Sequence, residues 1–197
     1  TALILALTHS FSDSTEEIIK ILAPLTNCNL QNCKGWTALM IASIPGVIAS
    51  MLNIDINSVI INAENIIKIL VKYIDCNIQN SEGLTALMLA SMSSNDNSTD
   101  EIVKILAQHT DCNIQNSEGL TALMLAAMSS RTDSTEETVK ILAPLTNCNI
   151  KNSEGQTALM LASKYKNTES TENTVSILAQ YTDRKSTRLN SSHGYRS

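Results

Sequence analysis

The residues with the clearest chemical potential are four cysteines that recur at one position of a repeated sequence. Cys28, Cys76, Cys112 and Cys148 each stand nine residues before a Thr-Ala-Leu triplet. A zinc site needs ligands around one point at about 2.3 Å, and a disulfide needs Cα atoms within about 7 Å. Copies of a helical repeat stack on the order of 10 Å apart, so these thiols form a row and cannot converge. We therefore predict buried, small hydrophobic side chains, with no metal and no cofactor.

The other candidate catalytic groups have structural explanations. The three histidines have no partner at metal-ligand spacing, and the chain contains no Walker loop, GxGxxG or HExxH motif. The acidic pairs Glu16/Glu17 and Glu136/Glu137 fall in the first turns of predicted helices, where they favour the positive end of the helix dipole. We therefore predict that the chain is not an enzyme.

Composition excludes several classes of partner and location. Hydrophobic residues make up 43% of the 197-residue chain but aromatic residues only 3%, which suits many small and similar packing units. The net charge of −5, without a basic stripe outside the last fifteen residues, predicts no nucleic-acid binding. The longest uncharged run, residues 37–54, contains Thr, Ser, Asn and a Pro-Gly pair, so we predict no membrane span. Five cysteines, an odd number, favour an intracellular, reducing location.

The elements that must position these residues follow from an internal repeat. The triplet Thr-Ala-Leu begins at Thr1, Thr37, Thr85, Thr121 and Thr157, at intervals of 36, 48, 36 and 36 residues. A period in this range indicates stacked units, none of which can bury its apolar face alone. A glycine stands two residues before each of the last four of these threonines.

The sequence of each unit predicts two helices and a polar turn. "TALMLA" begins the first helix, with the threonine hydroxyl placed to cap free backbone N–H groups. Ser14, Ser98 and Ser134, each three residues before a glutamate, predict the N-caps of the second helices. "EIVKILA" then has apolar residues at helical spacing, and "DCNIQNSEG" is a turn whose glycine suits a positive φ.

The pattern Gly-x-Thr-Ala-Leu-Met-x-Ala, followed by Glu-x-Val-Lys-Ile-Leu and Asp-x-Asn, resembles the ankyrin repeat. The resemblance implies an all-α solenoid of helix-turn-helix units joined by β-hairpin-like turns, covering residues 1–182 with units starting near residues 1, 37, 85, 121 and 157. "NIQNSEGLTALMLAS" with its Ser/Thr/Asn-rich loops is similar to ankyrin proteins of giant DNA viruses of protists (mimivirus-like). One departure from the family pattern is Met40, Met88, Met124 and Met160, which stand where the family usually has histidine.

Two segments depart from the repeat. An apolar insertion at about residues 45–57 lengthens the second unit, and we expect it to pack on the array as an extra helical turn or an extended first helix, or to serve as a partner-binding element.

Residues 183–193, "DRKSTRLNSSH", match one translation frame of a common sequencing adapter, so residues 183–197 are expected to be a non-native or disordered tail. The chain is expected to be a fragment of a longer array.

The resemblance implies a protein-protein interaction module that binds a protein partner on its concave face, in the cytoplasm (of a host cell if viral). The alternative is the substrate-recognition arm of a larger adaptor, such as a ubiquitin-ligase component. Trp36, Leu84 and Leu120 either form an exposed apolar row that anchors a partner or pack between adjacent turns. The positions flanking the turn glycines and those just after the first helices are the predicted partner-binding residues: Lys34, Trp36, Glu82, Leu84, Met92, Glu118, Leu120, Met128, Glu154, Gln156, Lys164 and Tyr165.

Overall fold

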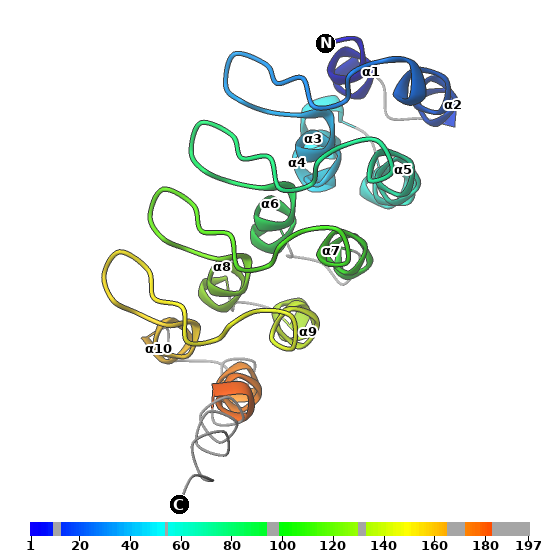
Figure 1. Cartoon of the computed structure of the whole chain (residues 1–197). Coiled ribbons are helices and arrows are strands. Elements are labelled where there is room, and N and C mark those ends of the chain that lie inside the picture. The colour runs from blue at the N-terminus through cyan, green and yellow to red at the C-terminus, as the bar shows by residue number, and fades with distance from the viewer. Residues whose placement is uncertain (10–12, 54, 94–98, 130–132, 165–171, 183–197) are drawn as a thin grey trace, which may run out of the picture.

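The protein is a stack of helix pairs, and a loop that projects to one side joins each pair to the next (Figure 1). The computed structural model describes residues 1–9, 13–53, 55–93, 99–129, 133–164 and 172–182. Within these residues the regular elements are helices, which confirms the predicted all-α class.

The helices form two parallel rows. The first helices of successive units pack on one another in chain order: α1 (Ala2–His9), α3 (Ala38–Ala42), α6 (Ala86–Met92), α8 (Ala122–Met128) and α10 (Ala158–Lys164). The second helices form the other row: α2 (Asp13–Leu22), continued by the short 3₁₀ helix η1 (Ala23–Leu25), then α5 (Ile56–Leu70), α7 (Asp100–Ala107) and α9 (Asp133–Leu142). Residues 172–182 are also helical.

The predicted threonine caps are confirmed. The hydroxyls of Thr37, Thr85 and Thr121 accept hydrogen bonds from the backbone N–H of the methionine three residues on, at 3.3, 3.2 and 3.3 Å. The Met40 sulfur accepts the N–H of Thr37 at 3.5 Å. A thioether is only a weak acceptor, but it partly replaces the polar contact expected of a histidine at this position.

The core is aliphatic and lies between the two rows of helices. Met40, Met88 and Met124 are each 1% exposed and fill the space between successive first helices. The four repeated cysteines are buried free thiols, as predicted. The Cys28 thiol, for example, lies 3.3 Å from the carbonyl oxygen of Ala23 and donates to it.

Two of the second helices, α2 and α9, begin earlier than the sequence predicted, whereas α7 (Asp100–Ala107) begins after Thr99. α2 starts at Asp13 and α9 at Asp133, so Ser14 and Ser134 lie inside the helices and the prediction that they are N-caps is wrong. Aspartate is itself helix-compatible in a first turn, because its charge opposes the positive dipole end. Ser98 lies outside the described residues.

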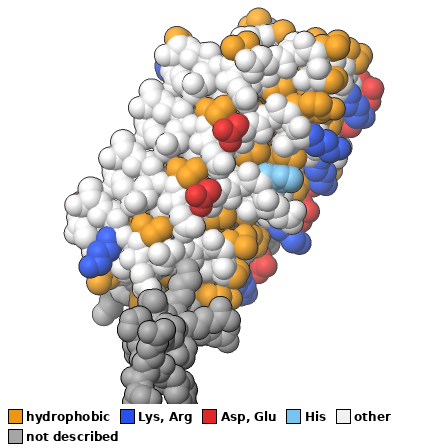
Figure 2. All heavy atoms as spheres, in the orientation of Figure 1, with side chains coloured by type: hydrophobic (Ala, Val, Ile, Leu, Met, Phe, Trp, Pro, Cys, Tyr) orange, Lys and Arg blue, Asp and Glu red, His pale blue; other side chains and the backbone are white. Residues whose placement is uncertain are grey.

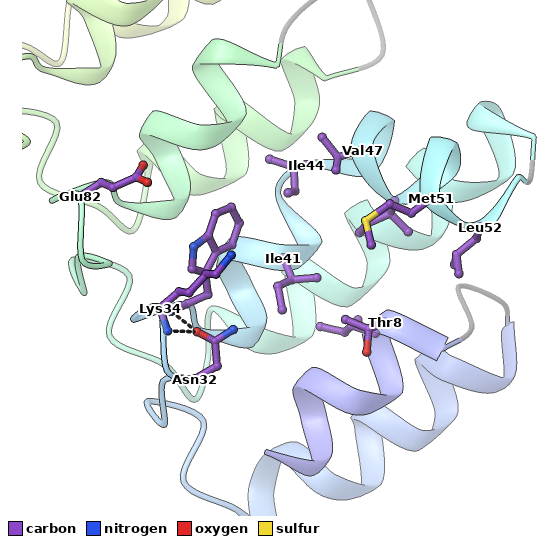
Figure 3. A pocket seen from close by; sticks show the side chains of 12 residues that line it. Thr8, Asn32, Lys34, Ile41, Ile44, Val47, Met51, Leu52 and Glu82 are labelled. Carbon is purple, nitrogen blue, oxygen red and sulfur yellow. Dashed lines mark hydrogen bonds between the residues drawn. The ribbon is translucent and has the colours of Figure 1, made fainter.

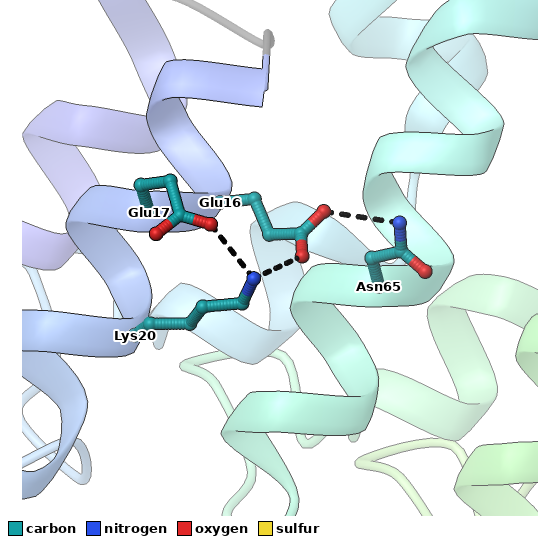
Figure 4. Close-up of polar contacts among 4 residues, drawn as sticks. All are labelled: Glu16, Glu17, Lys20 and Asn65. Carbon is teal, nitrogen blue, oxygen red and sulfur yellow. Dashed lines mark hydrogen bonds and ion pairs between the residues drawn. The ribbon is translucent and has the colours of Figure 1, made fainter.

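The first-turn glutamates of the second helices connect neighbouring units (Figure 4). Glu16 accepts from Lys20 at 2.8 Å on its own helix and from the Asn65 amide of α5 at 3.0 Å. Glu136 repeats the arrangement with Lys140 at 2.7 Å and Asn173 at 3.0 Å. The lysine hydrogen bond is the main cause of a lowered pKa at both carboxyls.

The turns have hairpin-like hydrogen bonding, although none of the described residues is assigned to a strand. In one of them, Asn80 donates its N–H to the carbonyl of Leu84 at 3.0 Å, and Gly83 donates to the carbonyl of Asn80 at 3.0 Å. Gly83 has φ of +76°, a conformation that a side chain disfavours. Successive loops are joined by backbone hydrogen bonds, such as that from the N–H of Ser117 to the carbonyl of Glu82 at 3.3 Å.

The insertion forms a separate helix, and the prediction of an extended first helix is wrong. α3 ends at Ala42, and α4 (Pro45–Leu52) begins with Pro45 at its first turn, where a missing N–H costs nothing. α4 packs against α5 through Ile48 and Ala49, which are buried. On its other side Val47 and Met51 are exposed.

Candidate functional site

The predicted partner-binding residues lie along the loops and first helices, with three degrees of burial. Lys34, Glu82, Met92, Glu118, Glu154 and Lys164 are exposed, and Trp36, Met128 and Gln156 are partly buried. Leu84 and Leu120 are buried at 7% and 4% exposure. Tyr165 lies outside the described residues.

Of the two alternatives for Trp36, Leu84 and Leu120, the packed arrangement holds for Leu84 and Leu120. Leu84 and Leu120 pack into the core beside the stacked loops, so they support the fold at these positions. Their backbone N–H groups are held by the Asn80 and Asn116 side chains at 2.9 and 2.8 Å, which fixes the chain direction into the next helix. Only Trp36 keeps a partly exposed side chain.

Trp36 lines an apolar hollow of about 330 Å³ between the first loop and the insertion helix. The side chains of Ile41, Ile44, Val47 and Met51 also line it. We call this the anchor hollow; its full lining is Leu7, Thr8, Asn32, Lys34, Trp36, Ile41, Ile44, Val47, Ile48, Met51, Leu52 and Glu82. Figure 3 shows Lys34 and Glu82 on the loop side of the hollow and Met51 and Leu52 on the side of α4.

A second, smaller hollow of about 240 Å³ lies one unit further along the array. Leu84, Leu120 and Leu125 contribute apolar surface, while Glu82 and Glu118 contribute carboxylates. We call it the acidic hollow; its full lining is Glu82, Leu84, Met92, Asn116, Ser117, Glu118, Leu120 and Leu125. Glu82 lines both hollows, so the two are adjacent.

The structure thus brings together seven of the predicted residues in two neighbouring hollows: Lys34, Trp36, Glu82, Leu84, Met92, Glu118 and Leu120. Met128, Glu154, Gln156 and Lys164 line neither of them. The sequence analysis left open that the insertion binds a partner but named no residue there; the structure adds Ile44, which precedes α4, and Val47 and Met51 of α4. Their i, i+3, i+7 spacing was a signal for one helix face, but the repeat has no equivalent segment to show where that face points.

Charge is arranged differently on the face with the hollows and on the edge of the second helices. Figure 2 shows acidic side chains beside hydrophobic patches along the middle of one face, and basic and acidic side chains next to one another along the edge of the second helices. Lys20, Lys68, Lys104 and Lys140 are on those second helices, and each has a glutamate partner on its own helix. Among the described residues, Glu82 and Glu118 have no such lysine partner.

The buried cysteines are expected to be unreactive. Burial raises the pKa of Cys76 to about 11 and also raises the pKa of Cys28 and Cys112. A thiol must ionise to act as a nucleophile or a metal ligand, so these groups are poor at both near neutral pH. No group of three or more potential metal ligands occurs within the described part of the chain.

The family match agrees with this architecture. The family described as Ankyrin repeats (3 copies) matches residues 92–190, just over half of the chain. No curated protein matches the sequence. The chain belongs to the ankyrin repeat family, whose members are generally protein-protein interaction modules and typically non-enzymatic scaffolds. Among the described residues, every helix is too short or too polar to cross a bilayer.

Proposed function

We propose that this chain holds a protein partner on the face formed by its loops and first helices, and that it acts by binding alone. The observation that carries the proposal is the pair of adjacent hollows, which contain seven of the predicted binding residues. Partner sites are concave surfaces with an apolar centre and a polar rim. The anchor hollow has that composition: Trp36, Ile44 and Val47 contribute apolar surface, and Lys34 and Glu82 contribute charge.

The second helices give a contrasting surface. Their exposed lysines are paired with glutamates three or four residues away. Exposed pairs of this kind stabilise a helix only slightly, and they leave little unpaired lysine charge for a partner. This surface is therefore a suitable control for binding experiments.

Affinity capture with matched surface variants tests the proposal. The immobilised wild-type chain is compared with Trp36→Ala and Glu118→Arg on the proposed face, and with Lys104→Glu on the second-helix face. Proteins retained by wild type and by Lys104→Glu but lost from both other variants would support the proposal. Equal retention by all variants, or loss only from Lys104→Glu, would contradict it. Circular dichroism of each variant establishes that the array is folded.

A further inference from the structure

We propose that the two hollows form one groove for an extended peptide segment with a large apolar side chain and, three residues away, an arginine or lysine. The apolar side chain occupies the anchor hollow and the cation occupies the acidic hollow. This inference rests on the proposed function and specifies the chemistry of the partner. It does not depend on whether that segment belongs to a folded or an unfolded protein.

The anchor hollow is suited to one apolar side chain. Its volume of about 330 Å³ is at the small end of the range for ligand pockets, roughly 300–1,000 Å³. Val47 and Met51 are 48% and 75% exposed at its edge, although both are large apolar residues. Covering them with an apolar side chain removes that surface from water, worth about 25 cal/mol per Å².

The acidic hollow is suited to a long cationic side chain. Met92, which is 45% exposed, can cover the aliphatic stem of an arginine or lysine, and Glu82 and Glu118 line the same hollow. Lysine and arginine bury their stems along apolar surface and keep the charged group in a polar setting. An acidic side chain would instead place a third negative charge beside these two carboxylates, which disfavours binding.

The spacing of the two side chains follows from the repeat. Glu82 and Glu118 occupy the same position in successive loops, and Ser117 of the later loop donates its N–H to the carbonyl of Glu82 at 3.3 Å. Stacked units of this type are on the order of 10 Å apart. An extended chain advances about 3.3 Å per residue, so about three residues span one unit.

Local charge favours the same segment. Among the described residues, Glu82 and Glu118 have no lysine partner, whereas the lysines of α2, α5, α7 and α9 are each paired with a glutamate on their own helix. A basic side chain is therefore attracted to the acidic hollow. At physiological ionic strength the attraction acts over about 8 Å, so it reaches a peptide that is already near the groove.

Fluorescence anisotropy with defined peptides tests this inference. The probes are fluorescein-labelled Ser-Gly-Leu-Ser-Gly-Arg-Ser-Gly and its reversed sequence, because the groove has two possible chain directions. Matched peptides replace the arginine with glutamate, replace the leucine with serine, or place leucine and arginine next to each other. We expect one direction to bind the wild-type chain at least about tenfold more tightly than all three matched peptides, a difference of about 1.4 kcal/mol.

Two charge-reversal variants locate the binding. Glu118→Arg should weaken the best peptide about tenfold, because it removes one carboxylate of the acidic hollow and adds a like charge. Glu154→Arg changes the same loop position in the next unit, which lines neither hollow, and should leave the affinity within about twofold. Equal effects of the two variants, or equal affinity for the arginine and glutamate peptides, would overturn the inference. If captured proteins are nevertheless lost from Trp36→Ala and Glu118→Arg, the proposed function stands and only the peptide chemistry is wrong.

Discussion

The interior loops and the last loop of the array contain nearly the same residues but have different surroundings. A methyl group on Gly119 would lie 2.8 Å from the backbone nitrogen of Ser153 in the next loop, whereas one on Gly155 would meet nothing within 4 Å. Met124 is 1% exposed, while Met160 at the same position is 55% exposed. The comparison shows that a repeated residue acquires its energetic role from the unit that packs on it.

The largest expected difference is between alanine variants of two methionines, Met124 and Met160, in the free energy of unfolding. Met124→Ala should lower the free energy of unfolding by about 2–5 kcal/mol, because it removes buried surface and leaves a cavity. Met160→Ala should change it by no more than about 0.5 kcal/mol, as for other exposed side chains. Urea unfolding followed by far-ultraviolet circular dichroism measures both values. Similar losses for the two variants would show that α10 is covered as α8 is.

Alanine variants of the turn glycines Gly119 and Gly155 should differ less from each other in their free energy of unfolding. Gly119 and Gly155 have φ of +74° and +75°, so alanine at either position costs about 1–2 kcal/mol for its left-handed backbone. Gly119→Ala also forces the next loop to move, which adds about 1–3 kcal/mol of overpacking. The same unfolding experiment on both variants measures this added cost. A Gly155→Ala loss as large as that of Gly119→Ala would refute the role given to the neighbouring loop.

Residues 115 and 151, which occupy the same loop position in successive units, provide a further comparison of an interior loop with the last loop. Gln115 donates to the carbonyl of Gly119 in its own loop at 2.5 Å and to the carbonyl of Lys151 in the next loop at 2.9 Å. Gln115→Ala should therefore lower the free energy of unfolding by about 1 kcal/mol. Lys151 occupies the same position one unit later and is exposed, so Lys151→Ala is the matched control with an expected change near zero. Native-state hydrogen exchange at the Gly119 and Lys151 loops would show whether the glutamine holds them together.

The reaction rates of the cysteines with a thiol reagent show which thiols of the folded chain are accessible to solvent. Cys33 is exposed where the later loops have Ser81, Ser117 and Ser153, whereas the four repeated cysteines are buried. Burial makes those four thiols inaccessible, and it raises the pKa of Cys28, Cys76 and Cys112. A colorimetric thiol titration of the folded chain should therefore detect one fast-reacting group, and Cys33→Ser should abolish the fast phase. Rapid reaction of a second thiol would show that the cysteine row is open to solvent.

Much of the fold could be predicted because it is specified locally and repeated. Thr85 and Thr121 cap their helices through atoms three residues away, and Gly83 and Gly119 need positive φ within their own turns. The buried row of cysteines also followed from one position recurring in every unit. The helix starts were predicted wrongly where only a spacing pattern was available. Ser14 and Ser134 have the spacing of a capping box, but the helices begin before them.

The candidate site was predicted in part for the same reason. Loop positions such as Glu82 and Glu118 could be assigned to one face by alignment of the units. The burial of Leu84 and Leu120 could not, because it depends on how tightly successive loops approach. The contribution of Val47 and Met51 depends on the direction in which α4 leaves α3, and no other unit contains that helix.

The helical units, the threonine caps of the first helices, the turns and the repeat that makes the units stack could be predicted from the sequence, because they depend on contacts within a few residues or on one period. The tertiary structure decided which copies of a residue are covered, as Met124 is and Met160 is not. It also decided that a loop tryptophan, an inserted helix and two successive loop glutamates line adjacent hollows. The physical reason is that burial and concavity are properties of neighbouring units, which identical sequence letters do not specify.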